Sequence, residues 1–295
     1  MIIKAQIEST NICNFDCPLC PRKILKLPIK QMNFSLYRKV LFNLKKVNWL
    51  DLTGWGEPLS HPRIAEMISE AKKNGKKVSL TTNASLLRGQ VLNNILKSKI
   101  DFLTFSLDSV SKNILTDHNK KTAIRNIGNF QKLKTQTKTK VQITLINQSQ
   151  KELESIINFC AENGIMEVNL CRLEEKIVSG KKNIKDEEKV FYQLRKFAKT
   201  KKVSVKMYPY DFGKFPQNLG YKIGGKTLYK NRCPKPRFSI YINVNGQATP
   251  CCNLPHLEIS DATKSPIGDI LNSAKRKKFF KNEKKHCQGC RAMLV

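Results

Sequence analysis

The chain has 295 residues, 40% of them apolar, which is enough for one large domain or for a large and a small domain with a buried core. Its 54 Lys and Arg residues outnumber the 23 Asp and Glu residues, and the net charge of +31 would attract polyanions such as RNA or acidic peptides. No stretch approaches the roughly 18 to 20 apolar residues that a bilayer span requires, so we expect no membrane association.

Residues 2–7 alternate weakly between apolar and polar side chains and predict a strand that leads into a loop with three cysteines. These are Cys13, Cys17 and Cys20, spaced C-x3-C-x2-C. Structural zinc takes four ligands and a cubane iron–sulfur cluster has four iron corners, so three thiols complete neither centre. The run predicts a cubane with one corner open to a ligand that is not protein, or a zinc site completed by a distant His or Cys.

Strands and helices then alternate along the chain. Apolar runs predict further strands at residues 47–52, 77–82, 102–107, 141–146 and 166–170. Helical spacing of apolar residues predicts helices at 34–44, 64–73, 86–95, 122–133 and 151–163. Six strands that alternate with helices require a parallel sheet with right-handed crossovers, with functional loops at the carboxyl ends of the strands.

The cysteine run resembles the signature of the radical S-adenosylmethionine (SAM) enzymes, although the residue before the third cysteine is Leu19 where the family usually has an aromatic residue. The resemblance implies an α/β fold whose core is a six-stranded (β/α)6 partial TIM barrel. It also implies that Cys13, Cys17 and Cys20 are the catalytic cysteines and bind a [4Fe–4S] cluster. SAM would occupy the open iron, and its reductive cleavage would give a 5′-deoxyadenosyl radical that abstracts hydrogen from substrate.

The second strand runs into Gly54-Trp55-Gly56-Glu57-Pro58. Glycines at two positions let the backbone approach a neighbour closely. The segment resembles the Gly-Gly-Glu-Pro turn of the family, with Trp55 inserted between the glycines. The resemblance implies that Gly54, Gly56 and Glu57 contribute to binding SAM.

Polar residues end the next strands. Asn83 lies at the end of the third strand, Ser106 and Asp108 lie at the end of the fourth, and Asn147 follows the fifth. In the family such residues meet the ribose and carboxylate of SAM, so the resemblance implies cofactor contacts for Asn83, Ser106 and Asp108, with Asn147 a lesser candidate. The alternative is that they only cap the helices that follow.

A second cysteine system begins at Cys233 and continues with Cys251, Cys287 and Cys290. Strands at residues 238–244 and 247–250 flank Asn245-Gly246, a dipeptide that predicts a type I′ hairpin turn. A short helix is predicted within residues 267–280. Four thiols at this spacing suit a zinc ribbon as well as an iron–sulfur cluster.

The pattern C-x12-G-x4-C followed by C-x2-C resembles the auxiliary-cluster domains of radical SAM enzymes, called SPASM in the two-cluster form and Twitch in the shortened one. Only five residues follow Cys290, so the resemblance implies a single auxiliary [4Fe–4S] cluster on the four cysteines. We therefore expect a radical SAM core over residues 1–208 and a small cluster-binding domain of a β-hairpin and a helix over 209–295.

The expected function is that of a radical SAM enzyme that modifies a peptide or protein. A small-molecule dehydrogenase, an RNA-modifying enzyme and a non-catalytic metal-binding protein are the alternatives. Charge alone supports RNA, and the lysines outnumber the arginines 43 to 11, whereas planar contacts to nucleic acid favour arginine. The resemblance implies a reducing partner such as ferredoxin or flavodoxin. The first residues show no charged-then-apolar leader, so we expect a cytoplasmic protein.

Overall fold

The computed structural model describes residues 4–27, 29–110, 120–146, 148–172, 187–208, 222–223, 226–227, 233, 235–288 and 290. Most described strands join one sheet with the order β12-β11-β10-β1-β2-β3-β4-β5-β6-β7. The strands of this sheet are β1 Lys4–Ile7, β2 Trp49–Asp51, β3 Lys77–Thr82, β4 Phe102–Ser106, β5 Lys138–Leu145, β6 Glu167–Arg172, β7 Ser204–Tyr208, β10 Ser239–Ile242, β11 Gln247–Thr249 and β12 Ser260–Asp261. A separate antiparallel pair consists of β8 Lys222–Ile223 and β9 Lys226–Thr227.

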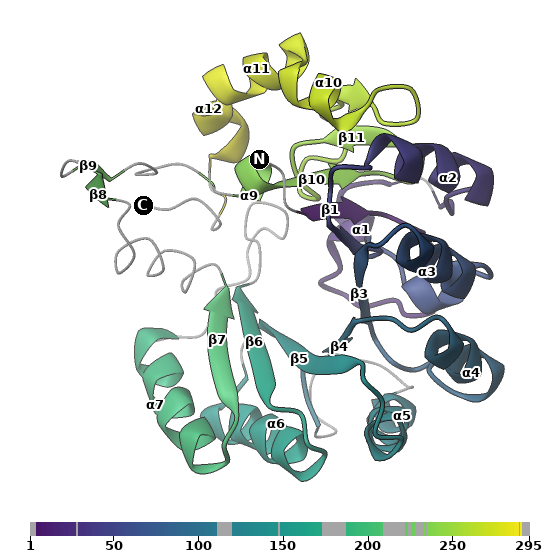
Figure 1. The fold of residues 1–295 in the computed structure, drawn as a ribbon. Coiled ribbons are helices and arrows are strands. Elements are labelled where there is room, and N and C mark those ends of the chain that lie inside the picture. Colours follow the sequence, from purple (N-terminus) through teal and green to yellow (C-terminus); the bar gives the residue numbers. More distant parts are fainter. Residues whose placement is uncertain are drawn as a thin grey trace.

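The six predicted strands pair in parallel and in chain order, and the sheet extends beyond them at both edges. Strand β7 pairs in parallel with β6, and β10 pairs in parallel with β1. The hairpin of β10 and β11 is thus continuous with the barrel sheet. Figure 1 shows these strands as a curved wall.

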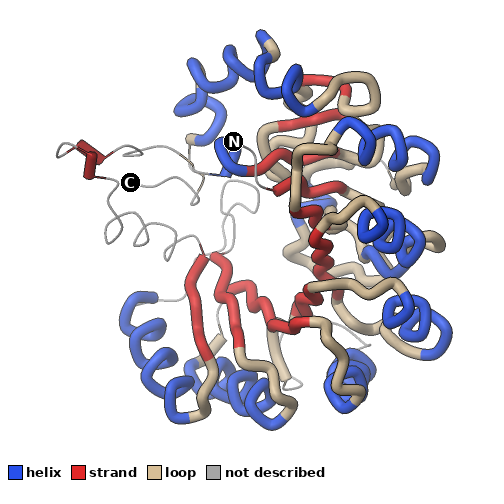
Figure 2. The backbone as a smooth tube through the Cα atoms, viewed as in Figure 1, coloured by secondary structure: helices blue, strands red, loops and turns tan. Residues whose placement is uncertain are grey.

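Helices cover the outer side of this wall, as Figure 2 shows. They follow the alternation that the apolar spacing predicts. Along the barrel they are α1 Pro21–Ile24, α2 Phe34–Asn43, the 3-10 turn η1 Pro58–Ser60, α3 Ile64–Lys73, α4 Gly89–Lys97, α5 Lys120–Lys132, α6 Gln150–Glu162 and α7 Glu187–Thr200. The carboxyl-terminal segment adds α9 Lys235–Phe238, α10 Ile267–Asn272, α11 Ala274–Lys281 and α12 Glu283–Cys287.

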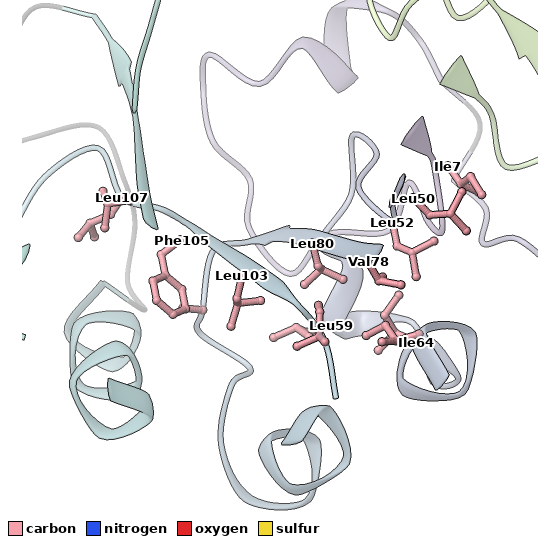
Figure 3. Packing of buried hydrophobic residues seen from close by; sticks show 14 of the residues in the cluster. Ile7, Leu50, Leu52, Leu59, Ile64, Val78, Leu80, Leu103, Phe105 and Leu107 are labelled. Carbon is pink, nitrogen blue, oxygen red and sulfur yellow. The ribbon is translucent and has the colours of Figure 1, made fainter. Parts of the chain in front are cut away.

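The core lies between the sheet and these helices. Leu50 of β2, Leu80 of β3 and Phe105 of β4 are fully buried on the side of the sheet that the helices cover (Figure 3). The Phe105 ring packs edge-on against Phe130 of α5 at 6.0 Å. Alternate residues of a strand point to opposite faces, so the intervening positions face the inner side of the wall. This leaves the carboxyl ends of the strands free to carry polar loops.

The hairpin turn differs from the predicted type I′ turn, which requires positive φ at both central residues. Only Gly246 has positive φ, +79°, whereas Asn245 does not. The side-chain oxygen of Asn243 accepts hydrogen bonds from the backbone N–H groups of Asn245 and Gln247, both at 3.0 Å. The Asn243 side chain therefore favours a type I turn that ends in a left-handed glycine, a common three-residue loop.

Boundaries in the carboxyl-terminal segment also differ from the prediction. Phe238 belongs to α9 rather than to the hairpin strand. The helix expected within 267–280 is divided at Ser273, which is extended and whose side chain caps α11 by accepting from Arg276 N at 3.2 Å. No helix in the described residues is both long and apolar enough to cross a bilayer.

Candidate cluster and cofactor site

The three-cysteine loop follows β1 and ends at the start of α1. Cys20 is the N-cap of α1, and its N–H donates to Cys17 O at 3.1 Å. The Sγ of Cys13 accepts from Phe15 N at 3.4 Å. All three thiols are half-buried and free. The loop is thus a compact turn that holds three unpaired thiols at the rim of the barrel.

Electrostatics show that these thiols are close neighbours. Burial, together with the nearby Cys20, Cys13 and Asp108, raises the pKa of Cys17 to about 11. Burial also raises the pKa of Cys13. The charges of Glu57 and Cys20 raise this pKa as well, whereas the charge of Arg22 lowers it. Thiolates at such a site need a positive counter-charge, which bound iron or zinc would supply.

The glycine turn after β2 packs directly under the cysteine loop. Gly56 N donates to Thr10 O at 3.1 Å and Glu57 N donates to Ile12 O at 2.8 Å. A Cβ at Gly56 would overlap the backbone oxygens of Thr10 and Ile12, and a Cβ at Gly54 would overlap the side chain of Glu8. Both glycines are therefore required by contacts within the protein, beside the role toward SAM that the resemblance implies.

Glu57 is 2% exposed, and its carboxylate accepts three hydrogen bonds from neighbouring groups of the protein. The donors are Thr82 Oγ1 and Asn83 N, each at 2.7 Å, and Leu59 N at 2.9 Å. Burial raises the pKa of this carboxyl group. Glu57 thus fastens the glycine turn to the end of β3.

Two of the predicted polar residues lie close to the cysteine loop. The Asn83 side-chain amide donates to Asn14 Oδ1 at 3.1 Å, within the three-cysteine run. Asp108 accepts from Thr144 N at 2.7 Å, and burial raises its pKa to about 6. Because Asp108 also raises the pKa of Cys17, its carboxyl group lies near the loop.

Ser106 ends β4 and is half-buried, and its register partner on β5 is Gln142. Asn147 lies outside the described residues. The structure therefore brings Asn83 and Asp108 toward the cysteines and leaves Ser106 at a strand end.

The second cysteine system is held by a buried ion pair. Arg237 of α9 donates to both carboxylate oxygens of Glu283, at 2.7 and 2.6 Å, and to Cys233 O at 2.7 Å. Cys233 N donates to the same carboxylate at 3.2 Å. Glu283 opens α12, which ends at Cys287. The pair thus fixes the first cysteine against the helix that carries the third.

Three of these four cysteines are near one another. Burial raises the pKa of Cys233 to about 11, with Cys287 and Glu283 adding to the effect. Burial raises the pKa of Cys251 as well, and Cys252 and Cys233 add to it. Cys290 N donates to Cys287 O at 3.0 Å, so the fourth thiol follows closely.

Trp55 connects the two cysteine systems. Its indole N–H donates to the backbone oxygen of Cys252 at 3.0 Å, and its backbone N–H donates to Glu8 Oε1 at 3.1 Å. The same Glu8 accepts from Val244 N at 3.4 Å in the hairpin loop. The residue that interrupts the glycine pair therefore links the turn after β2 to the carboxyl-terminal cysteines.

Comparison with models of protein families shows which family the chain belongs to. The model described as "Radical SAM superfamily" matches residues 7–160, more than half of the chain. The chain belongs to the radical SAM superfamily. A second match, to SPASM, described as "Iron-sulfur cluster-binding domain", covers residues 233–291 of this radical SAM protein and includes all four carboxyl-terminal cysteines.

Individual relatives agree with this assignment. A "Tungsten-containing aldehyde ferredoxin oxidoreductase cofactor-modifying protein" of Pyrococcus furiosus is 30% identical over 115 residues, 37% of this chain and 32% of that protein. The curated relatives are matched over 32% to 55% of their own length. Their names support an enzyme.

Solved structures share the fold. Streptococcus suis SuiB bound to precursor peptide SuiA has a TM-score of 0.78 at 17% identity, covering 99% of this chain and 70% of that one. Native anSMEcpe with bound AdoMet and a Cp18Cys peptide has a TM-score of 0.72 at 15% identity, covering 98% and 87%. Together with the family matches, they support [4Fe–4S] clusters and SAM as the cofactors of this radical SAM protein.

The residues present fit such cofactors. Among the described residues, no group of three His, Cys, Asp or Glu side chains is placed to hold a single metal ion. Arg22 donates to Asn11 O at 3.1 Å, and its Nε–H is buried without a partner in the part of the chain that the structure describes. An unpartnered buried donor beside three thiols suits an acceptor such as a cluster sulfur.

Sequence reasoning missed Glu8, Arg22, Trp55 and the Arg237–Glu283 pair. Arg22 lies two residues after the third cysteine and could have been found from that spacing. The others act through partners far away in the chain, and only the fold reveals them.

Proposed function

We propose that this protein is a radical SAM enzyme with one auxiliary [4Fe–4S] cluster that abstracts hydrogen from a peptide or protein substrate. The main support is the contact between the three-cysteine loop and the glycine turn, in which Gly56 and Glu57 donate to Thr10 and Ile12. Through this contact the loop with three thiols and the glycine turn lie against each other.

Cys13, Cys17 and Cys20 would hold the first cluster, and Cys233, Cys251, Cys287 and Cys290 the second. When bound, the first cluster and SAM supply one-electron cleavage of SAM and a radical able to remove hydrogen from an unactivated C–H bond. Three thiols leave one iron corner for SAM. Four thiols leave none, so the second cluster would serve electron transfer or support the wall of the active site.

The surrounding residues would keep this site in shape. Glu57 fixes the glycine turn to the end of β3 by accepting hydrogen bonds from Thr82 and Asn83. Arg22 donates to Asn11 O and so holds the end of the cysteine loop against the residues that precede it. Gly54, Gly56, Asn83, Ser106 and Asp108 would face SAM. Asp108, with its pKa raised to about 6, would hold a proton in mildly acidic solution and be charged at neutral pH.

A peptide substrate is supported by fold alone. The SuiB structure contains its precursor peptide and the anSMEcpe structure contains a peptide, and both share the fold along nearly the whole chain. The competing proposal is a small-molecule substrate, supported by the Pyrococcus relative, which is named a cofactor-modifying protein. Incubation of the enzyme with cell extract, followed by mass spectrometry of captured peptides and metabolites, would distinguish the two.

Two further features belong to this proposal. Reductive cleavage consumes an electron, so the enzyme would need a reducing partner such as ferredoxin or flavodoxin. None of the ten cysteines forms a disulfide in the structure, which suits a reducing compartment, and we place the protein in the cytoplasm.

The test is anaerobic reconstitution of wild type, Cys17→Ala and Cys160→Ala. Cys160 is a buried thiol on α6, far from the proposed ligands in sequence, and serves as the matched control. We expect Cys17→Ala to lose 5′-deoxyadenosine formation and about half of roughly eight bound irons while remaining folded. Cys160→Ala should keep both. Deoxyadenosine formation by Cys17→Ala would refute the assignment.

A further inference from the structure

The outer surface of α11 and α12 carries a dense group of lysines. Six of the eleven residues from 275 to 285 are Lys, whereas Lys makes up 43 of the 295 residues in the whole chain. All six are exposed, and none forms an ion pair with a residue that the structure describes. We call them the basic face: Lys275, Lys277, Lys278, Lys281, Lys284 and Lys285.

No acidic side chain offsets the basic face from within its own segment. The one carboxylate between residues 274 and 288 is Glu283, which is 4% exposed and bonded to Arg237. The positive potential of the basic face therefore reaches solvent.

The basic face adjoins the second cysteine system. Helix α12 carries Lys284 and Lys285 on its exposed side and ends at the buried Cys287. Figure 1 shows α11 and α12 side by side at the outer edge of the carboxyl-terminal segment. Any centre bound by Cys287 and Cys290 would lie directly beneath lysine-rich surface.

From these observations we propose that the basic face is the docking surface for an acidic one-electron carrier protein. The inference rests on the proposed function, which consumes one electron for each cleavage of SAM. In this step the carrier is oxidised by one electron, and the iron–sulfur centre of the enzyme is reduced by one. Complementary charge suits such a partner because electron-transfer complexes bury little surface and associate rapidly.

The available groups favour an acidic protein over RNA. Nucleic-acid contacts draw on arginine planes and exposed aromatic rings. Arg276 instead donates to Leu271 O and Pro236 O, both at 3.1 Å, and lies over the ring of Phe280. Phe279 is buried. What remains for a partner is a set of ammonium groups, which match scattered carboxylates.

The test compares two triple variants of the reconstituted enzyme that change the net charge equally. One is Lys278→Glu, Lys281→Glu and Lys285→Glu on the basic face. The control is Lys97→Glu, Lys132→Glu and Lys196→Glu, three exposed lysines on α4, α5 and α7. Binding of oxidised acidic flavodoxin is measured by calorimetry, and oxidation of flavodoxin hydroquinone is followed by stopped flow.

At about 0.05 M salt we expect the basic-face variant to slow electron transfer tenfold or more and to weaken flavodoxin binding, with less than a twofold change in the control. Equal slowing in both variants, or none, would overturn the proposal. So would loss of polyuridylate binding in the basic-face variant with flavodoxin transfer unchanged, because the surface would then serve RNA.

Chemical reduction separates the proposed docking surface from the proposed enzymatic function on which it rests. With dithionite, wild type and both variants should release 5′-deoxyadenosine at the same rate, because a small reductant needs no docking surface. Absence of product from wild type with dithionite would refute the proposed function itself. Normal product with dithionite and an unaltered flavodoxin rate in the basic-face variant would refute the docking surface alone.

Discussion

Removing one partner of the buried Arg237–Glu283 pair should cost several times more stability than removing one partner of an exposed pair of the same chemistry. Glu283→Gln removes the negative charge but keeps an acceptor for Cys233 N, and it leaves the Arg237 guanidinium buried without its counter-charge. Breaking one side of a buried pair costs about 3 to 5 kcal/mol, and we expect about 3 because one acceptor is kept. That is a large part of a typical domain stability of about 5 to 15 kcal/mol.

The matched control is Glu66→Gln, which breaks the two-pronged pair of Arg63 and Glu66. Its side chains are 47% and 55% exposed, so the loss should be at most about 1 kcal/mol. Urea unfolding of iron-free protein can be followed by the fluorescence of Trp55, whose indole bonds to Cys252 O, in a Trp49→Phe background. Equal shifts in the two variants would refute the reasoning, since burial would then make no difference.

Three further outcomes can be measured on the same material. Gly56→Ala should destabilise the iron-free protein by about 2 kcal/mol, because its Cβ meets backbone that cannot yield, whereas Gly268→Ala in α10 has open space and should be neutral or stabilising; matching urea midpoints would contradict this. The raised pKa of Asp108, about 6 in the folded protein against 3.8, means that the folded state keeps a proton that the unfolded state has released. The wild-type stability should therefore fall as pH rises from about 4 to about 6, more steeply than in Asp108→Asn, and parallel stability curves would show that the pKa is not raised. Finally, Cys251 and Cys252 lie beyond β11, which ends at Thr249, so the alternation of side chains along a strand does not choose between them. The spacing of four residues after Gly246 favours Cys251 as the ligand, so Cys252→Ala should keep the full iron content while Cys251→Ala loses about half; electron paramagnetic resonance showing the reverse would mean a shift of one residue in ligand register.

Local sequence determined much of the barrel. The prediction for residues 77–82 coincides with β3, and that for 64–73 coincides with α3, because buried strands and amphipathic helices carry their periodicity within a few residues. Strand β5 begins at Lys138, three residues before the predicted start. Its first residues include Lys138 and Lys140, which pair with β4 through their backbone but lack the apolar side chains by which the strand was predicted. Hydrophobicity marks only the buried part of a strand.

Pairings between distant segments could not be predicted. Nothing in the residues of β10 indicates that it joins β1 in parallel, and the hairpin was expected in a separate domain. A strand carries no local record of its partner, so such pairings depend on the whole fold.

The candidate site divides in the same way. Spacing alone identified the cysteines, since three thiols within eight residues have few uses. Trp55 appeared as an insertion in the glycine turn, and its partner Cys252 lies 197 residues away. Glu8 likewise appeared as an ordinary polar residue of the first segment, although it receives hydrogen bonds from both Trp55 and Val244.

During synthesis on the ribosome, β1 is made long before its partner strand β10. Lys4 pairs with Ser239 in register, so one edge of β1 stays unpaired until more than 230 further residues have been made. At about 5 to 20 residues per second, this wait lasts roughly 10 to 50 seconds. During that time the nascent barrel presents an open strand edge beside the cysteine loop, which is a template for pairing with other chains. This edge is therefore a place where the nascent chain can pair with a wrong strand before its own partner has been made.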